Sequence, residues 1–217
     1  MATLADIYRP KTWDTVIGQE KAIGKLKRLQ KAGRLSGRGY WIVGASGIGK
    51  TTIAEIIASE VADEMNILRL RVAEITPAML RTLEYNMRMV AMGKKKGKAI
   101  IINEAHGLRK DAIRAFKDVL ENLPDNVVIL FTTTRQEEGN LFDDGNTEDA
   151  GPFRDRCTVV NLTNQGLAKP FAVRAQEIAI AEGLDGKPIG SFVMLLKNCK
   201  NSMRGALSRI DDGIMVD

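Results

Sequence analysis

The sequence predicts an α/β protein built on a parallel β-sheet, because short apolar segments alternate with longer segments of helical periodicity. The apolar segments are rich in β-branched residues and mostly lack polar alternation, as strands do when helices cover both faces of their sheet. The candidates are YWIV (40–43), NILRL (66–70), AIII (99–102), VVILFTTT (127–134) and CTVV (157–160). We therefore expect a five-stranded parallel sheet flanked by helices.

The helical segments divide the chain into two parts. After the first and third candidate strands, apolar residues recur at helical spacing, at 53–61 and 113–120. Beyond residue 161 the sequence contains no further strand candidate. Three helical patterns follow one another there, with Gly, Pro or Asn between them: 166–184, 189–198 and 202–215. We expect an α/β domain at residues 1–161 and a small three-helix domain at residues 162–217.

The composition argues against a secreted or membrane protein. Hydrophobic residues make up 44% of the chain and charged residues 27%, which suits a globular domain with a buried core. No apolar run approaches the roughly eighteen residues of a membrane span, and MATLADIYRP at the start lacks a signal-peptide core. Cys157 and Cys199 form neither a disulfide framework nor a metal-ligand spacing. We expect a cytoplasmic or nucleoid-associated protein without a membrane partner.

The net charge of +5 is unevenly distributed along the chain. The segment EEGNLFDDGNTEDA (137–150) contains six acidic residues and no Lys or Arg, so the rest of the chain carries a net charge of +11. We interpret this segment as a flexible acidic surface loop. The basic remainder either binds a polyanion such as nucleic acid, because Lys and Arg release counterions from phosphates, or forms an ordinary solvated surface.

A phosphate-binding loop follows the first candidate strand. GASGIGKTT (44–52) satisfies the pattern G-x-x-x-x-G-K-[ST] between a strand and a helix. The glycines let the backbone curl so that N–H groups face phosphate oxygens, and the helix N-terminus adds its dipole. We expect Lys50 to reach the β- and γ-phosphates and Thr51 to ligate Mg²⁺. The ATP-binding candidates in this loop are Gly44, Ala45, Ser46, Gly47, Ile48, Gly49, Lys50, Thr51 and Thr52.

A second polar feature ends the third candidate strand, where Asn103 and Glu104 follow AIII. In this architecture that strand lies beside the phosphate-binding loop, so we predict that Glu104 orients or deprotonates the attacking water. The alternative for Glu104 is a helix N-terminal acid favoured by the dipole.

Asn103 stands where ATP-hydrolysing P-loop proteins normally carry Asp. Its amide oxygen can hold a metal-bound water but supplies no charge, so we expect weaker Mg²⁺ binding and slower turnover. The Asn is either natural to a slow, switch-like ATPase or an introduced substitution.

Several segments in collinear order resemble the clamp-loader branch of the AAA+ ATPases, in particular the bacterial DNA polymerase III gamma/tau subunit and the small subunits of replication factor C. YRPKTWDTVIGQEKAI (8–23) resembles the family's N-terminal box, FRDRC (153–157) its S-R-C motif and NSMRGALSRIDDGI (201–214) its sensor 2 helix. Taken singly, these segments could be ordinary core or surface sequence, but their shared order favours the family. The resemblance implies a P-loop AAA+ core followed by a helical lid.

The resemblance also implies roles for individual residues. Thr133, or its neighbour Thr132, takes the sensor 1 position, and Arg204 takes that of the sensor 2 arginine. Arg156 corresponds to the arginine finger that serves the nucleotide of a neighbouring subunit. The residues expected to border the adenine are Tyr8, Arg9, Pro10, Val16 and Ile17. The candidates for DNA contact, on the helix after Glu104, are Arg109, Lys110, Arg114 and Lys117.

Other features depart from the family pattern. Asp155 replaces the Ser of S-R-C and could pair with Arg154 or restrain Arg156. The loop at 136–152 is longer and more acidic than expected, and the chain has no four-cysteine zinc module. We also expect that the collar domain, which holds a clamp-loader ring together, is absent after residue 217. The chain is then either a fragment or assembles through its ATPase and lid surfaces.

The resemblance implies an ATP- and Mg²⁺-dependent subunit of a clamp-loader-like ring. Its expected partners are other loader subunits, a sliding clamp and primer–template DNA. Two alternatives stay open: a non-replicative AAA+ switch or scaffold that hydrolyses ATP weakly, and a motor of the helicase-loader or branch-migration type.

Overall fold

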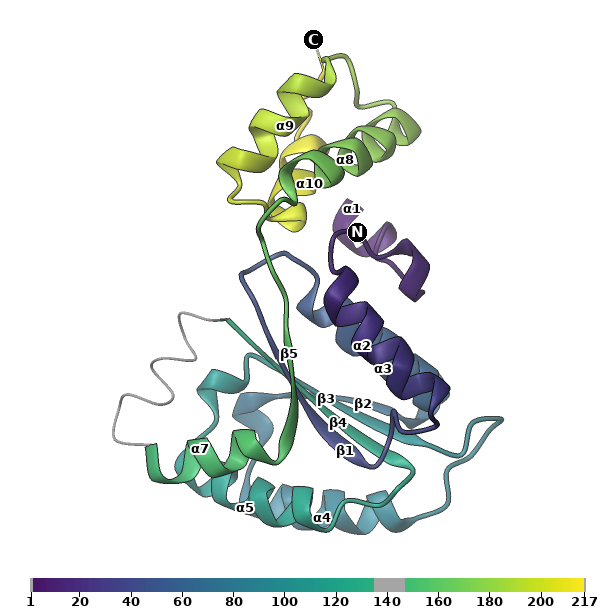
Figure 1. Ribbon diagram of the computed structural model, residues 1–217, viewed down its shortest axis with the longest axis vertical. Helices are drawn as coiled ribbons and strands as arrows, with labels where there is room; N and C mark the ends of the chain where they lie inside the picture. The colour runs from purple at the N-terminus through teal and green to yellow at the C-terminus, as the bar shows by residue number, and fades with distance from the viewer. Residues whose placement is uncertain (1, 135–146, 217) are drawn as a thin grey trace.

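The computed structural model describes residues 2–134 and 147–216, and its centre is a parallel sheet (Figure 1). The strands are β1 (Arg38–Val43), β2 (Ile67–Arg71), β3 (Lys98–Asn103), β4 (Val127–Thr133) and β5 (Cys157–Asn161). They form one five-stranded sheet in the order β2-β3-β4-β1-β5, and all pairs are parallel. The predicted sheet is confirmed, and the strand ends agree with the prediction to within two residues.

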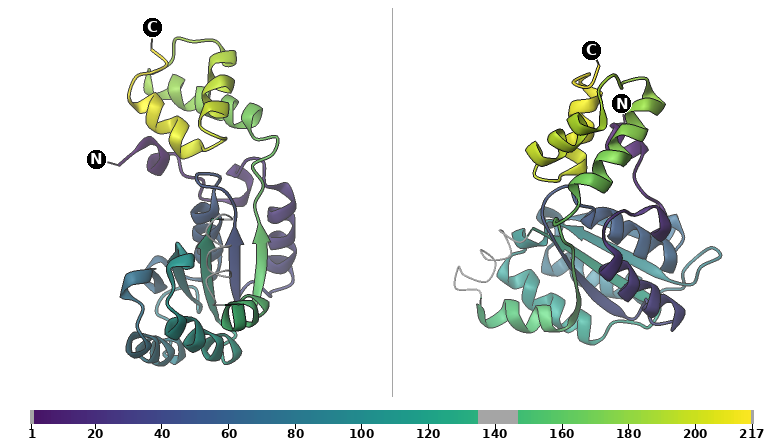
Figure 2. Two further views of the ribbon diagram at one scale, coloured as in Figure 1. Left: turned by 90° about the vertical axis from the view of Figure 1, so that its left-hand side faces the viewer. Right: turned by 45° about the horizontal axis from the view of Figure 1, so that its top comes forward.

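Two layers of helices cover the sheet, as the edge-on view in Figure 2 shows. Helices α2 (Glu20–Lys31) and α3 (Lys50–Val61) lie on one face, and α4 (Pro77–Arg88), α5 (Lys110–Glu121) and α7 (Thr147–Asp155) lie on the other. Successive strand residues point alternately into the two cores, as Leu130 and Phe131 do. Within residues 2–134 and 147–216, no helix is long and apolar enough to cross a membrane.

Helices α4 and α7 were not predicted from the sequence. Helix α4 begins with Pro77 in its first turn, and the Thr76 hydroxyl accepts a hydrogen bond of 3.2 Å from the amide of Met79. The loop prediction for 137–150 and for 136–152 is wrong from residue 147 onward, because α7 begins there. The earlier part of that segment lies outside the described residues.

The edge strand β2 also differs from the expected two-sided burial. The side chains of Leu68, Arg69 and Arg71 are exposed. Arg69 bonds to Glu55 of α3 at 2.7 Å and to Glu64 at 2.7 Å, which covers part of this edge with charge.

An aromatic cluster joins β1, β4, α5 and α7. Trp41, Phe116, Phe131 and Phe153 are all fully buried. The ring centroids of Phe131 and Phe153 are 5.0 Å apart, and those of Phe116 and Phe131 are 5.2 Å apart, both in edge-to-face geometry. These contacts fix α5 and α7 against the same two strands.

The remaining helices lie beyond the carboxyl ends of the strands (Figure 1). They are α8 (Ala168–Glu182), α9 (Ile189–Asn198), α10 (Met203–Asp211) and the short N-terminal α1 (Leu4–Ile7), which packs against α10. The buried Gln19 amide exchanges two hydrogen bonds with the backbone of Thr163, at 2.8 and 3.1 Å. We propose that residues 162–217 act as a separate lid.

Replacing Phe116 by Ala should lower the free energy of unfolding by about 3–5 kcal/mol, because the change removes a fully buried ring and leaves a cavity. Urea denaturation of the purified chain measures this difference. Tyr85→Ala is the control, since this ring is 66% exposed and its loss should change stability by no more than about 0.5 kcal/mol. Equal effects of the two substitutions would contradict the assigned role of the cluster.

Candidate nucleotide-binding site

The phosphate-binding loop joins β1 to α3 and depends on glycine at three positions. Gly47 and Gly49 have φ angles of +74° and +108°, which other residues rarely adopt. Gly44 is favoured for a different reason, since a Cβ there would lie 2.7 Å from Cδ1 of Ile48, 3.0 Å from Cβ of Leu162 and 3.3 Å from the Leu162 carbonyl oxygen. At Gly47 the loop also meets α10, because the amide of Met203 donates a 3.1 Å hydrogen bond to the Gly47 carbonyl. The lid and the loop are therefore in direct contact.

Lys50 is held over the phosphate-binding loop. Its side chain is buried, and its Nζ donates to the carbonyl oxygens of Gly44 at 3.0 Å and Ala45 at 2.9 Å. Lys50 also begins α3, so the ammonium group and the positive end of the helix lie together. This arrangement favours a bound anion.

Asn103 connects the phosphate-binding loop to the neighbouring strand. Its Oδ1 accepts a hydrogen bond of 3.3 Å from the Thr51 hydroxyl and one of 2.9 Å from the Thr132 hydroxyl. A carboxylate could accept both bonds in the same way, and it would add a negative charge. Asn103 therefore keeps the geometry of the connection and lacks the charge.

Thr132, and not Thr133, is the strand residue that reaches Asn103, whereas either residue is a candidate for the sensor 1 position. The two side chains point to opposite faces of β4. The hydroxyl of Thr133 is directed to the carbonyl of Thr134, at 3.4 Å, and its own carbonyl accepts from the amide of Gly44 at 3.3 Å.

Glu104 follows Asn103 in a left-handed backbone conformation, with φ 57° and ψ 42°. This conformation costs a non-glycine residue roughly 1–2 kcal/mol. Glu104 lines the same cavity as Lys50, its side chain is 63% exposed, and its Oε2 lies 3.6 Å from Nδ1 of His106. Asn103 thus bonds to Thr51 while its neighbour Glu104 stays open to the cavity.

Apolar side chains line the other end of the cavity. Tyr8 is fixed there, because its hydroxyl donates to Glu182 of α8 at 2.6 Å and the guanidinium carbon of Arg174 lies 5.9 Å from its ring centroid. The hydrogen bond to Glu182 raises the pKa of Tyr8. The predicted residues that line the cavity are Tyr8, Arg9, Pro10, Val16, Ile17, Ser46, Gly47, Ile48, Gly49, Lys50, Thr51, Thr52, Glu104 and Arg204.

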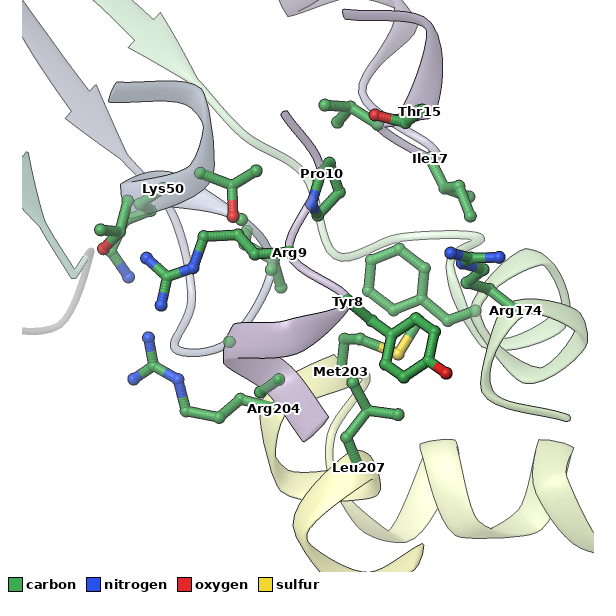
Figure 3. A pocket seen from close by; sticks show the side chains of 18 of the residues that line it. Tyr8, Arg9, Pro10, Thr15, Ile17, Lys50, Arg174, Met203, Arg204 and Leu207 are labelled. Atoms are coloured by element: carbon green, nitrogen blue, oxygen red, sulfur yellow. The ribbon is translucent and has the colours of Figure 1, made fainter. Parts of the chain in front are cut away.

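Arg9, which we expect to border the adenine, lines the cavity with its guanidinium group directed away from the aromatic side chains. Figure 3 shows its guanidinium group on the same side of the cavity as Lys50 and Arg204. Asp6 accepts a 2.7 Å hydrogen bond from Arg9, and hydrogen bonds from Thr3 and Arg9 lower the pKa of Asp6. The cavity therefore has a cationic end and an aromatic end.

Several lining residues, most of them in the helical lid, were not predicted from the sequence. They are Ala5, Thr15, Phe171, Arg174, Ile178, Met203 and Leu207. Phe171, Arg174 and Ile178 lie on one face of α8, at helical spacing that is visible in the sequence. Nothing in that spacing tells which helix face meets the cavity, because the contact depends on how the lid packs.

Arg156 lies away from this cavity. It directly precedes β5, whose first residue Cys157 is aligned with Gly39 near the start of β1. The phosphate-binding loop begins after Val43 at the other end of β1, more than about 13 Å along the strand. The carboxylate that contacts Arg156 is Glu121, rather than Asp155 as we considered.

The candidates for DNA contact also lie outside the cavity. Lys110, Arg114 and Lys117 follow each other at helical spacing along α5, and Arg109 directly precedes that helix. Arg109 is anchored locally, because its guanidinium donates to the carbonyl of Ile75 at 3.5 Å and lies 3.7 Å from Asp111.

Comparison with known proteins agrees with this architecture. The family described as "ATPase family associated with various cellular activities (AAA)" matches residues 40–141. Replication factor C small subunit 1 of Pyrobaculum islandicum is 30% identical over 207 residues, which are 93% of this chain and 58% of that protein. The Holliday junction branch migration complex subunit RuvB of Thermotoga petrophila is 27% identical over 124 residues, 56% of this chain and 35% of that protein. The chain thus spans little more than half of the replication factor C relative.

The solved structure of the Thermotoga maritima RuvB Holliday junction branch migration motor has the same fold. It matches with a TM-score of 0.68 at 23% identity, over 94% of this chain and 64% of that chain. The sheet order, the phosphate-binding loop and these comparisons lead to one assignment: the chain belongs to the AAA family of ATPases, and replication factor C small subunits are among its relatives.

Proposed function

We propose that this chain is the ATP-binding and ATP-hydrolysing part of a subunit in a clamp-loader-like complex. The observation that carries the proposal is the cavity between the phosphate-binding loop and the lid, with Lys50, Arg9 and Arg204 at one end. The other end is lined mainly by aromatic and aliphatic side chains, with Arg174 over the ring of Tyr8. A nucleoside triphosphate has the same division between its base and its phosphates. ATP is the nucleotide that the AAA family assignment supports.

The phosphates of ATP would lie at the cationic end. Lys50, Arg9 and Arg204 supply positive charge there, and the N-terminus of α3 supplies backbone donors. The base would lie between Tyr8 and the lid side chains of α8 and α10. Since the lid contributes to both ends, bound nucleotide would hold the lid against the sheet domain.

Mg²⁺ fits the residues beside the phosphate-binding loop. The Thr51 hydroxyl is a hard oxygen ligand, and Asn103 Oδ1, which lies 3.3 Å from it, can accept from a metal-bound water. Bound Mg²⁺ neutralises charge on the triphosphate. Because Asn103 is neutral, the protein itself contributes less negative charge here than an aspartate would.

Hydrolysis needs an oriented water and stabilisation of the charge that develops on the γ-phosphate. We assign Glu104 to hold the water, because its carboxylate is exposed to the cavity next to Asn103. Lys50 stabilises the γ-phosphate within the subunit, and Thr132 keeps Asn103 in place.

Arg156 would complete the site of a neighbouring subunit. It precedes β5 at the amino end of the sheet, whereas its own subunit's phosphate-binding loop lies at the carboxyl end. A residue so far from its own site can act only on another copy or another subunit. The other proposed partners are a sliding clamp and primer–template DNA, in keeping with the replication factor C relatives, and we propose the basic residues of α5 as the DNA contacts.

One observation favours a second candidate function. The neutral Asn103 would suit an AAA switch or scaffold that binds ATP and hydrolyses it slowly. The likeness to RuvB structures keeps a DNA-stimulated motor as a further candidate.

Stimulation of ATPase activity distinguishes these candidates. A clamp-loader subunit, assayed with its complex, should hydrolyse ATP faster when a sliding clamp and primer–template DNA are both present. A switch should respond to neither, and a branch-migration motor should respond to DNA without the clamp. Absence of a combined effect of clamp and DNA would reject the clamp-loader assignment.

Asn103→Asp should strengthen Mg²⁺ binding, because it adds a charge where the hydrogen bonds to Thr51 and Thr132 already exist. A gain of about 1.4 kcal/mol corresponds to a roughly tenfold lower Mg²⁺ concentration at half-maximal rate. Mg²⁺ titration of the steady-state ATPase rate measures this shift. Asn103→Ala is the control for lost hydrogen bonding and should move the midpoint the other way. A variant with Asp that gains neither metal affinity nor rate contradicts the electrostatic explanation.

Arg156→Ala should lower the ATPase rate of the assembled protein by about 10³-fold and leave ATP binding by the single chain unchanged. The wild-type rate per subunit should rise with protein concentration, since each site needs a neighbour's arginine. Nucleotide titration and a concentration series measure these two effects. Arg34→Ala, which removes an exposed arginine after α2, is the matched control. A rate that is independent of concentration and insensitive to Arg156→Ala is incompatible with the trans role.

A further inference from the structure

The guanidinium group of Arg156 is held from two sides within its own subunit. Its Nε donates to Oε1 of Glu121 at 2.8 Å, and its Nη2 donates to the same oxygen. Its Nη1 donates to the carbonyl oxygen of Pro152 at 2.8 Å. All three guanidinium nitrogens therefore have a partner, and these hydrogen bonds fix the orientation of the guanidinium plane.

The two groups that hold Arg156 belong to rigid parts of the fold. Glu121 is the last residue of α5, and Pro152 lies in α7. The aromatic cluster joins these helices, since Phe116 of α5 and Phe153 of α7 have ring centroids 6.4 Å apart. The backbone amide of Arg156 also donates to the carbonyl of Phe153, at 3.3 Å. Glu121 is therefore placed by the core and not by a mobile loop.

Fold stability is a poor explanation for this ion pair. The side chains of Arg156 and Glu121 are 34% and 50% exposed, and ion pairs as exposed as this one contribute little to stability. The larger effect is on the conformational freedom of the arginine, because an unpaired arginine side chain samples many rotamers. Glu121 removes part of that freedom before any partner is bound.

The hydrogen bonds also leave donors for a partner. A guanidinium has five N–H groups in a fixed plane, and the contacts with Glu121 and Pro152 use three of them. The remaining two, one on each Nη, can donate to phosphate oxygens without release of Glu121. The pairing is thus compatible with phosphate binding by the same arginine.

We propose that Glu121 is a positioning residue for Arg156, which orients the guanidinium group toward the nucleotide of a neighbouring subunit. This inference rests on the trans role of Arg156 under the proposed function. Under this proposal, each nucleotide site depends on Glu121 of the neighbouring subunit, a carboxylate that does not contact the nucleotide. The opposite role, in which Glu121 withholds Arg156 until assembly, is an outcome of the test.

A double-mutant cycle tests the proposal on the assembled complex. Wild type, Glu121→Ala, Arg156→Ala and the double variant are compared for kcat and KM with ATP, at saturating protein concentration. Glu121→Ala should lower kcat by about 10–10²-fold with KM for ATP changed less than about twofold, because only the geometry of the finger is lost. In the Arg156→Ala background the same substitution should have no further effect. Glu121→Gln, which keeps the shape and one acceptor oxygen, should lie between Glu121→Ala and wild type.

Controls separate this role from a structural one. Thermal unfolding of Glu121→Ala should stay within a few degrees of wild type, as expected for loss of an exposed ion pair. Asp118→Ala, which removes another exposed carboxylate from α5, should leave kcat unchanged.

Each contrary result has a distinct meaning. A faster Glu121→Ala variant overturns positioning in favour of restraint, and an equal loss in both backgrounds shows that Glu121 acts independently of Arg156. If Arg156→Ala lowers kcat and Glu121→Ala does not, only the positioning role is overturned. If Arg156→Ala itself has no effect, the trans role and the positioning role are both rejected.

Discussion

The common direction of the five strands is the constraint on which the candidate site depends. Because all strands are parallel, the carboxyl ends of β1, β3 and β4 lie together at one end of the sheet. This brings Thr51, Asn103 and Thr132 within hydrogen-bond distance although they are far apart in the sequence. Because β5 runs in the same direction, Arg156, which precedes it, lies at the amino end of the sheet. The parallel arrangement of the strands therefore assembles the nucleotide site at one end of the sheet and places Arg156 at the other end.

Asn103 shows how geometry and charge can be separated at such a site. Its oxygen is bonded to Thr51 and Thr132, so the link between the phosphate-binding loop and β4 is intact. Nucleotide affinity would then come mainly from Lys50 and the backbone of the loop, which do not depend on a carboxylate at this position. The metal is the component most sensitive to the missing charge, because carboxylate ligation contributes through electrostatics. Binding and turnover can therefore differ in their dependence on this one residue.

The strands and the phosphate-binding loop could be predicted from the sequence because their signals are local: β-branched apolar runs, and glycines that the loop needs at Gly47 and Gly49. The sequence could not show which of Thr132 and Thr133 reaches Asn103. Both faces of β4 are buried, so no alternation of polar and apolar residues indicates which face each side chain occupies. The direction of the Arg9 side chain could not be predicted either, because it depends on the pairing of Arg9 with Asp6. The contact of Glu121 with Arg156 joins two helices and became visible only with their packing.

Helix α5 links the two ends of this arrangement. It begins six residues after Glu104, which lines the subunit's own cavity, and it ends at Glu121, which holds Arg156. Its 12 residues span about 18 Å at 1.5 Å per residue. Phe116 anchors the helix in the aromatic cluster, so it moves with β4 and α7 as one packed unit. Under the proposed function, a subunit's own nucleotide site and the arginine it presents to a neighbour are therefore positioned by the same helix, and neither can shift far without the other.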